Sequence, residues 1–300
     1  STNIKTRADF SCALYDRLVR PVAQAFAQPN HLGSLALLVP KVIAHYGAGN
    51  LGPGDAILVN HPYMGGVHLN DITLITPVFY AGELFGYVAS LAHHVDVGGG
   101  APASVGAFRE VYQEGIIIPP VKLVHAGQTV PDIMKLVLAQ IRSKRETAGD
   151  LRAQVAANNT GVRRMTALID QLGRQAVDDY VDELIDYTRR RAQAEIAKLP
   201  HGAYFAEGVV DNDGFTDQPV HLQVRATVDD AGVCFDLTGC DPQRRAPVNS
   251  THSQTFAACA YVLKCLIDPD VPVNHGFYST VKMIAPEGTV VNAVAPAPVV

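Results

Sequence analysis

Two short segments of the chain combine histidine, aspartate and glycine in a pattern that is typical of metal sites. The first, NHPYMGGVHLND at 60–71, places His68 three residues before Asp71. Side chains alternate along an extended strand, so a regular strand would point these two to opposite faces. The preceding Gly65 and Gly66 permit a turn or bulge, which would bring both side chains to one point.

The second segment, AHHVDVGGG at 92–100, ends an apolar run with two histidines and an aspartate. Two imidazoles and one carboxylate at the ends of neighbouring strands suit Mn, Fe or Zn, and three protein ligands leave positions open for substrate. We therefore expect His68, Asp71 and His93 to bind a divalent transition metal. The alternative is that these histidines are packed residues bonded to the backbone, and the sequence leaves both interpretations open.

Two further groups lie close to this pattern. His94 points away from His93 in a regular strand, so we expect it to contact substrate or to support the ligands, oriented by Asp96. Gln113 and Glu114 in VYQEG are either catalytic residues or part of a helix cap.

Composition and motifs exclude several functions. The net charge of −5 offers no cationic surface for nucleic acid, and no stretch approaches the roughly 20 apolar residues of a membrane span. GAGNLG at 47–52 matches a dinucleotide fingerprint, but a helical pattern precedes it and a strand follows, so we expect a loop. The sequence contains no GxxxxGK[ST] phosphate loop, so we expect no ATP site here. The five cysteines lack CxxC spacing, which favours the reducing cytoplasm.

Hydrophobic patterning predicts the elements that carry these residues. Segments 72–80 and 84–92 are rich in β-formers and flank a short link with Gly82, which predicts a hairpin. Neither segment alternates between apolar and polar residues, so we expect both faces of these strands to be buried. The stretch 93–120 is rich in Gly, Ala and Pro and should be irregular and functional. Helices are predicted over 34–46 (with Ser34 as N-cap), 131–143, 147–172, 174–198 and 253–267, and strands over 56–60, 203–211, 219–229 and 232–238.

These elements predict an α+β fold: a mixed sheet with buried strands packed by helices, followed by a smaller β-rich region. Pro200 and Gly202 interrupt the pattern. We therefore place a metal and active-site domain at 1–200, with the helical segment 131–198, and a β-rich second domain at 201–300. The chain starts without Met and ends in a Pro/Val run, so we expect a piece of a longer protein whose second domain is incomplete at its C-terminal end.

Longer runs of residues carry a resemblance to a known family. Four follow one another in the chain: NHPYMGGVHLNDITLITPVF, AHHVDVGG, YQEGIIIPPVKL and GDLRAQVAANNTGVRR. Three more come later: DNDGFTDQPV, DLTGCDPQRRAPVN and APEGTVVN. In this order the runs resemble the hydantoinase B/oxoprolinase family over nearly all of the chain.

The resemblance implies a B-type subunit of an ATP-dependent enzyme that opens cyclic amides such as hydantoins, 5-oxoproline or larger lactams. An A-type partner subunit would bind ATP and phosphorylate the substrate oxygen, and this subunit would complete the hydrolysis, so we expect a hetero-oligomer. In carboxylase relatives the B-type chain holds a metal, at positions that match His68, Asp71 and His93. Water activated by that metal would attack the amide, with His94 or Glu114 as general base or proton donor.

Two alternatives and one departure accompany this resemblance. The chain could instead be the metal-containing subunit of an ATP-dependent ketone carboxylase, or a non-catalytic scaffold for the A-type subunit. Many relatives have Asn-Asp-Pro-Tyr where this chain has Asn60, His61, Pro62 and Tyr63. We expect the ring of His61 to face the same pocket as His68.

Overall fold

A long hairpin forms the centre of a seven-stranded antiparallel sheet. The computed structural model describes residues 1–25, 28–104 and 106–299. The hairpin pairs β4 (Asp71–Tyr80) with β5 (Glu83–His93), as the sequence predicts. The sheet order is β2-β1-β5-β4-β3-β6-β7. The other strands are β1 (Phe10–Asp16), β2 (Pro21–Gln24), β3 (Ala56–Val59), β6 (Val121–His125) and β7 (Gln128–Thr129).

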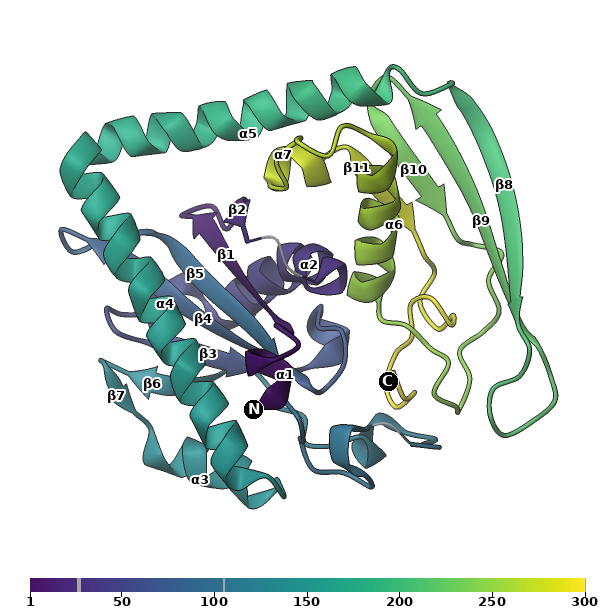
Figure 1. Ribbon diagram of the computed structural model, residues 1–300, viewed down its shortest axis with the longest axis horizontal. Helices are drawn as coiled ribbons and strands as arrows, with labels where there is room; N and C mark the ends of the chain where they lie inside the picture. Colours follow the sequence, from purple (N-terminus) through teal and green to yellow (C-terminus); the bar gives the residue numbers. More distant parts are fainter. Residues whose placement is uncertain (26–27, 105, 300) are drawn as a thin grey trace.

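Helices cover both faces of this sheet, which is why its central strands β4 and β5 are buried on both faces. Helix α2 (Pro29–Tyr46) packs on one face, where Leu35 and Val42 join Tyr15 and Tyr87 in one buried cluster. Helix α4 (Lys144–Leu172) crosses the other face over β4 and β5 (Figure 1). The expectation of a hairpin buried on both sides is confirmed: eight successive residues of β4 are buried.

A smaller four-stranded sheet follows, with the order β11-β10-β9-β8. It contains the parallel pairing, between β10 and β11, while its other pairs are antiparallel. Helix α5 (Arg174–Ile196) runs from the end of α4 toward this sheet (Figure 1). The α+β class is confirmed. The remaining elements are α1 (Thr2–Lys5), α3 (Pro131–Ala139), β8 (Gly202–Val210), β9 (Val220–Asp229), β10 (Gly232–Asp236), α6 (His252–Leu266), α7 (His275–Tyr278) and β11 (Val281–Ile284).

Helices α2 and α6 pack directly on each other between the two sheets. At Gly33 a Cβ atom would lie 2.4 Å from the Cα of Ala257, so only glycine allows this approach. Ala36 and Leu37 of α2 also pack against the cluster that contains α6. The division into domains near residue 200 stays a prediction, since elements from both halves share this contact.

The predicted start of α2 is wrong. The helix begins at Pro29 rather than after Ser34, because proline fits the first helical position, where its missing N–H is not needed. Ser34 lies inside the helix and donates to the carbonyl of His31. In the described part of the chain, none of the helices combines the length and hydrophobicity that crossing a bilayer would require.

Candidate metal centre

A tight turn brings His68 to Asp71. The backbone N–H of Asp71 donates to the carbonyl of His68 at 3.1 Å, and Asp71 is the first residue of β4. The side chains therefore do not alternate as they would along a strand. His68 Nε2 lies 3.2 Å from Asp71 Oδ1.

Strand pairing brings His93 to the same carboxylate oxygen. His93 is the last residue of β5 and lies directly opposite Asp71 in the register of the hairpin. Opposite residues on one face have Cβ atoms about 5 Å apart, within reach of an imidazole. His93 Nδ1 lies 3.1 Å from Asp71 Oδ1, and the rings of His68 and His93 have centroids 4.8 Å apart.

The donor set of this cluster fits a divalent transition metal. One ligand atom from each of His68, Asp71 and His93 lies within 4.8 Å of the others. Two imidazole nitrogens and a carboxylate oxygen suit Mn, Fe or Zn. The side chain of Asp71 is 2% exposed, while the two histidines are 18% exposed each, so the cluster is buried on the carboxylate side and open on the imidazole side.

Electrostatic interactions between His68 and Asp71 favour the charged form of each group. Burial by itself would raise the pKa of Asp71 and lower that of His68. Attraction between the two groups outweighs burial: His68, with His31 and His93 nearby, holds the pKa of Asp71 well below its usual range, and the Asp71 carboxylate raises the pKa of His68. Asp71 is therefore ionised at neutral pH, as a metal ligand must be.

Two buried asparagines fix the turn that carries His68. Asn70 Nδ2 donates to the carbonyl of His94, whose own N–H donates back to the carbonyl of Asn70, both at 2.8 Å. Asn60 Nδ2 donates to the carbonyl of Leu69 at 2.7 Å, and its Oδ1 accepts from the N–H of Ile118 at 2.6 Å. The turn is thus bonded on both sides to neighbouring segments, which lowers the entropy cost of holding the side chains of the cluster together.

The structure does not bring His94 into the cluster. Its ring is fully buried under α4, where Nε2 lies 3.0 Å from Gln154 Oε1. Burial lowers the pKa of His94, so the ring is neutral. The expectation that Asp96 orients it is wrong, because Asp96 instead accepts from the backbone and guanidinium of Arg142, at 2.6 and 3.0 Å.

Glu114 lies close enough to act on the cluster electrostatically. Its carboxylate contributes to the raised pKa of His68 and is itself completely buried. Oε1 accepts from the N–H of Val299 at 2.7 Å. The neighbouring Gln113 has a structural role, since its side chain accepts from the N–H of Glu110 in a capping box.

The fold adds three groups that sequence reasoning missed: His31, Asp9 and Ser11. His31, on the first turn of α2, has Nε2 at 3.6 Å from Asp71 Oδ2 and at 3.6 Å from Asp9 Oδ1. Ser11 Oγ lies 3.1 Å from His31 Nδ1. No spacing signal marks these residues, because packing of α2 and pairing of β1 bring them to the hairpin from distant parts of the sequence.

His61 packs beside Tyr63. Their rings meet edge to face with centroids 5.9 Å apart, and burial lowers the pKa of His61. The expectation that His61 faces the pocket of His68 stays a prediction.

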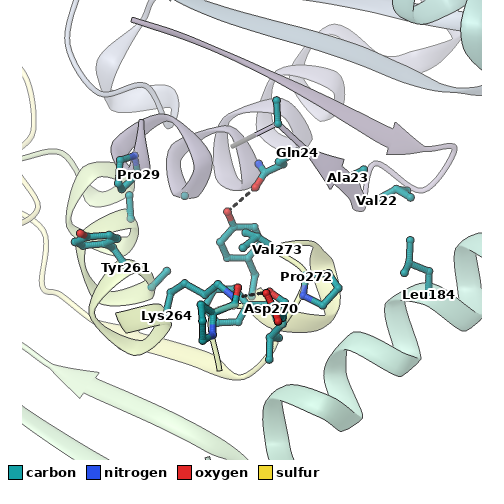
Figure 2. A pocket seen from close by; sticks show the side chains of 18 residues that line it. Val22, Ala23, Gln24, Pro29, Leu184, Tyr261, Lys264, Asp270, Pro272 and Val273 are labelled. Atoms are coloured by element: carbon teal, nitrogen blue, oxygen red, sulfur yellow. Dashed lines mark hydrogen bonds between the residues drawn. The ribbon is translucent and has the colours of Figure 1, made fainter. Parts of the chain in front are cut away.

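An apolar cavity of about 610 Å³ lies between β2, α2, α6 and α7 (Figure 2). Pro29 and Gly33 line it from α2, one helical turn apart, whereas His31 lies between them in sequence and points to the other side of the helix. Lys264 at the edge of the cavity donates to the carbonyls of Asp268, Pro269 and Val271. The cavity is therefore separate from the histidine cluster.

Comparison with known proteins places the chain in a family. The family model described as hydantoinase B/oxoprolinase matches residues 1–300. The chain belongs to the hydantoinase B/oxoprolinase family. This confirms the resemblance read from the ordered motifs.

Relatives of the family are similar along the whole chain. An uncharacterized protein of Methanocaldococcus jannaschii is 39% identical over 100% of this chain and 53% of its own length. 5-Oxoprolinase 1 of Arabidopsis thaliana is 34% identical over 96% of this chain and 25% of its own length. The chain thus spans between a quarter and about half of these relatives.

Solved structures share the fold. The crystal structure of the ATP-dependent caprolactamase from Pseudomonas jessenii superposes with a TM-score of 0.89 at 31% identity, over 97% of this chain and 50% of that one. Acetone carboxylase gives a TM-score of 0.90 at 20% identity, over 97% of this chain and 40% of that one, which shows likeness of fold alone.

Proposed function

We propose that the chain is the B-type subunit of an ATP-dependent enzyme that opens cyclic amides, with a divalent metal held by His68, Asp71 and His93. The observation that carries the proposal is the convergence of these three side chains, with one buried carboxylate and two partly open imidazoles. The similarity to an ATP-dependent caprolactamase supports the reaction class.

Each residue of the site would have a distinct part. A bound divalent ion would supply a Lewis acid that lowers the pKa of water at the site. His68 and His93 would hold the open side, and Asp71 would hold the buried side. Glu114 would take or give the proton as the amide bond breaks, while the neutral His94 would keep the turn in place through its backbone bonds to Asn70.

The energy for the reaction would come from a partner. An amide carbonyl is a poor electrophile, and phosphorylation of its oxygen makes the carbon easier to attack. The sequence of this chain contains no phosphate-binding GxxxxGK[ST] loop. We therefore assign ATP binding to an A-type subunit, in a hetero-oligomer with this chain.

The test is metal content and turnover in the complex of the whole protein with its A-type partner. The wild-type complex should hold about one Mn, Zn or Fe per B-type chain and should couple ATP hydrolysis to opening of hydantoins or lactams. His68→Ala should abolish both. The matched control is His125→Ala, which removes a histidine that lies 2.9 Å from Asp55 on the same sheet but outside the cluster.

Three results would contradict the proposal. Full metal content in a variant with His68, Asp71 and His93 all replaced would show that these three residues are not the metal ligands. Turnover by this chain without its partner would show that the reaction does not require activation by ATP on an A-type subunit. Consumption of ketone and bicarbonate in place of cyclic amides would assign the chain to a carboxylase instead.

A further inference from the structure

His31 occupies a buried position between two carboxylates. It is 3% exposed, and Nε2 lies 3.6 Å from both Asp71 Oδ2 and Asp9 Oδ1. On the other side of the ring, Nδ1 lies 3.1 Å from the hydroxyl of Ser11, which is fully buried. Every polar atom of the ring therefore has an oxygen neighbour.

This surrounding favours one tautomer of the ring. A lone pair on Nε2 would face two carboxylate oxygens and be repelled by them. The favoured arrangement has the Ser11 hydroxyl donating to Nδ1, which leaves the proton on Nε2, directed between Asp9 and Asp71. His31 is not among the residues whose ligand atoms converge within 4.8 Å, which are His68, Asp71 and His93, so we assign it a supporting position rather than that of a ligand.

The two oxygens of Asp71 consequently face different partners. Oδ1 lies 3.2 Å from His68 and 3.1 Å from His93, and Oδ2 faces His31. A carboxylate that binds a metal through one oxygen needs its other oxygen held, or it rotates between binding modes. Asp9 is tied into the same arrangement, since its carbonyl accepts the N–H of His93 at 3.0 Å.

We propose that His31, oriented by Ser11, is a positioning residue that holds Asp71 so that Oδ1 alone is presented to the metal. This inference rests on the proposed function of the cluster as a metal site. His31 lies on the first turn of α2. The packing of α2 on the sheet therefore determines where His31 meets the Asp71 carboxylate.

The test is titration of the metal-free complex with Mn(II), followed by the electron paramagnetic resonance signal of the free ion. His31→Leu should weaken binding by about 10- to 100-fold, the usual cost of losing such a support. His31→Gln should recover part of the loss, because its amide can still donate to Asp71. Ser11→Ala should weaken binding less than His31→Leu does, because the ring keeps its carboxylate neighbours.

The matched control is Tyr15→Phe. It removes a buried bond of 2.8 Å from Tyr15 to the carbonyl of Leu35, in the same contact of α2 with β1, without touching Asp71. Tyr15→Phe should lower the thermal stability of the metal-free complex and leave the Mn(II) affinity unchanged. If the role of His31 were purely structural, His31→Leu would likewise lower the thermal stability and leave the Mn(II) affinity unchanged.

Each outcome separates the alternatives. If His31→Leu, His31→Gln and Ser11→Ala all bind Mn(II) as the wild type does, the positioning role is overturned and the metal site stands. If His31→Leu abolishes binding as completely as His68→Ala does, and His31→Gln recovers none of it, His31 is a ligand and the inference is wrong. If the wild-type complex binds no divalent ion, the metal site fails and the inference fails with it.

Discussion

A single methyl group at Gly33 tests how the two halves of the chain are held together. A Cβ atom there would lie 2.4 Å from Ala257 Cα and 2.5 Å from its Cβ, so α2 and α6 would have to separate. Overpacking of this kind costs about 1–3 kcal/mol, and a clash with backbone belongs at the upper end. The higher helix propensity of alanine returns about 1 kcal/mol. We expect Gly33→Ala to lower the free energy of unfolding by about 2 kcal/mol.

Gly149 provides the matched control for this substitution. It lies on the exposed side of α4, and a Cβ there would meet no atom within 4 Å. Gly149→Ala should therefore raise the free energy of unfolding by up to about 1 kcal/mol, so the two variants should differ by about 3 kcal/mol.

The assay is urea unfolding followed by circular dichroism at 222 nm, because the chain contains no tryptophan for fluorescence. A second readout is Mn(II) affinity, which should fall in Gly33→Ala because His31 lies only two residues before Gly33 on the same first turns of α2. Equal stability of the two alanine variants would refute the close approach of α2 and α6.

Three further predictions concern buried polar and thiol groups. Burial raises the pKa of the Cys259 thiol to about 12, so iodoacetamide at pH 8 should modify the exposed Cys265 and spare Cys259, as peptide mass spectrometry would show. Gln154→Leu should cost about 1–3 kcal/mol in urea unfolding, because it leaves buried His94 without its partner. Burial alone would raise the pKa of Asp55, but hydrogen bonds from Lys122 and from backbone N–H groups lower this pKa by more than burial raises it. The ionised Asp55 carboxylate therefore contributes fully to stability above about pH 4, and this contribution is lost as pH falls. Asp55→Asn should therefore flatten the loss of stability on acidification, measured as the urea midpoint against pH.

The sequence predicts those parts of the fold that are determined by residues close together in the chain. The hairpin and its buried faces follow from composition over 72–92, and His68, Asp71 and His93 come together through one turn and one strand pairing within it. Strands β2, β6 and β7 were not predicted, because each has five residues or fewer and lies toward a side of the sheet, where pairing partners distant in sequence decide the conformation.

The rest of the site depends on contacts that no local pattern encodes. His31 reaches Asp71 only because α2 packs on the sheet, and Asp9 reaches His31 only because β1 pairs with β5. His94 shows the opposite case. The side chains of His93 and His94 point to opposite faces of the hairpin, as the sequence predicts. The sequence does not predict which of these faces α4 covers, so Gln154 could not be foreseen as the partner of His94.

The three residues that we propose as ligands all lie within the stretch 68–93, which has a consequence for the order of events during synthesis. A hairpin closes in about 1–10 μs, and this one leaves the ribosome before the residues of α4 that later cover its back. If the proposed site captured an ion at that stage, the ion would meet His68, Asp71 and His93 while these side chains were still adjustable. Selection among Mn, Fe and Zn would then follow intrinsic affinity and cellular supply rather than the geometry of the folded cluster. The metal recovered with the protein should accordingly change with the metal content of the growth medium.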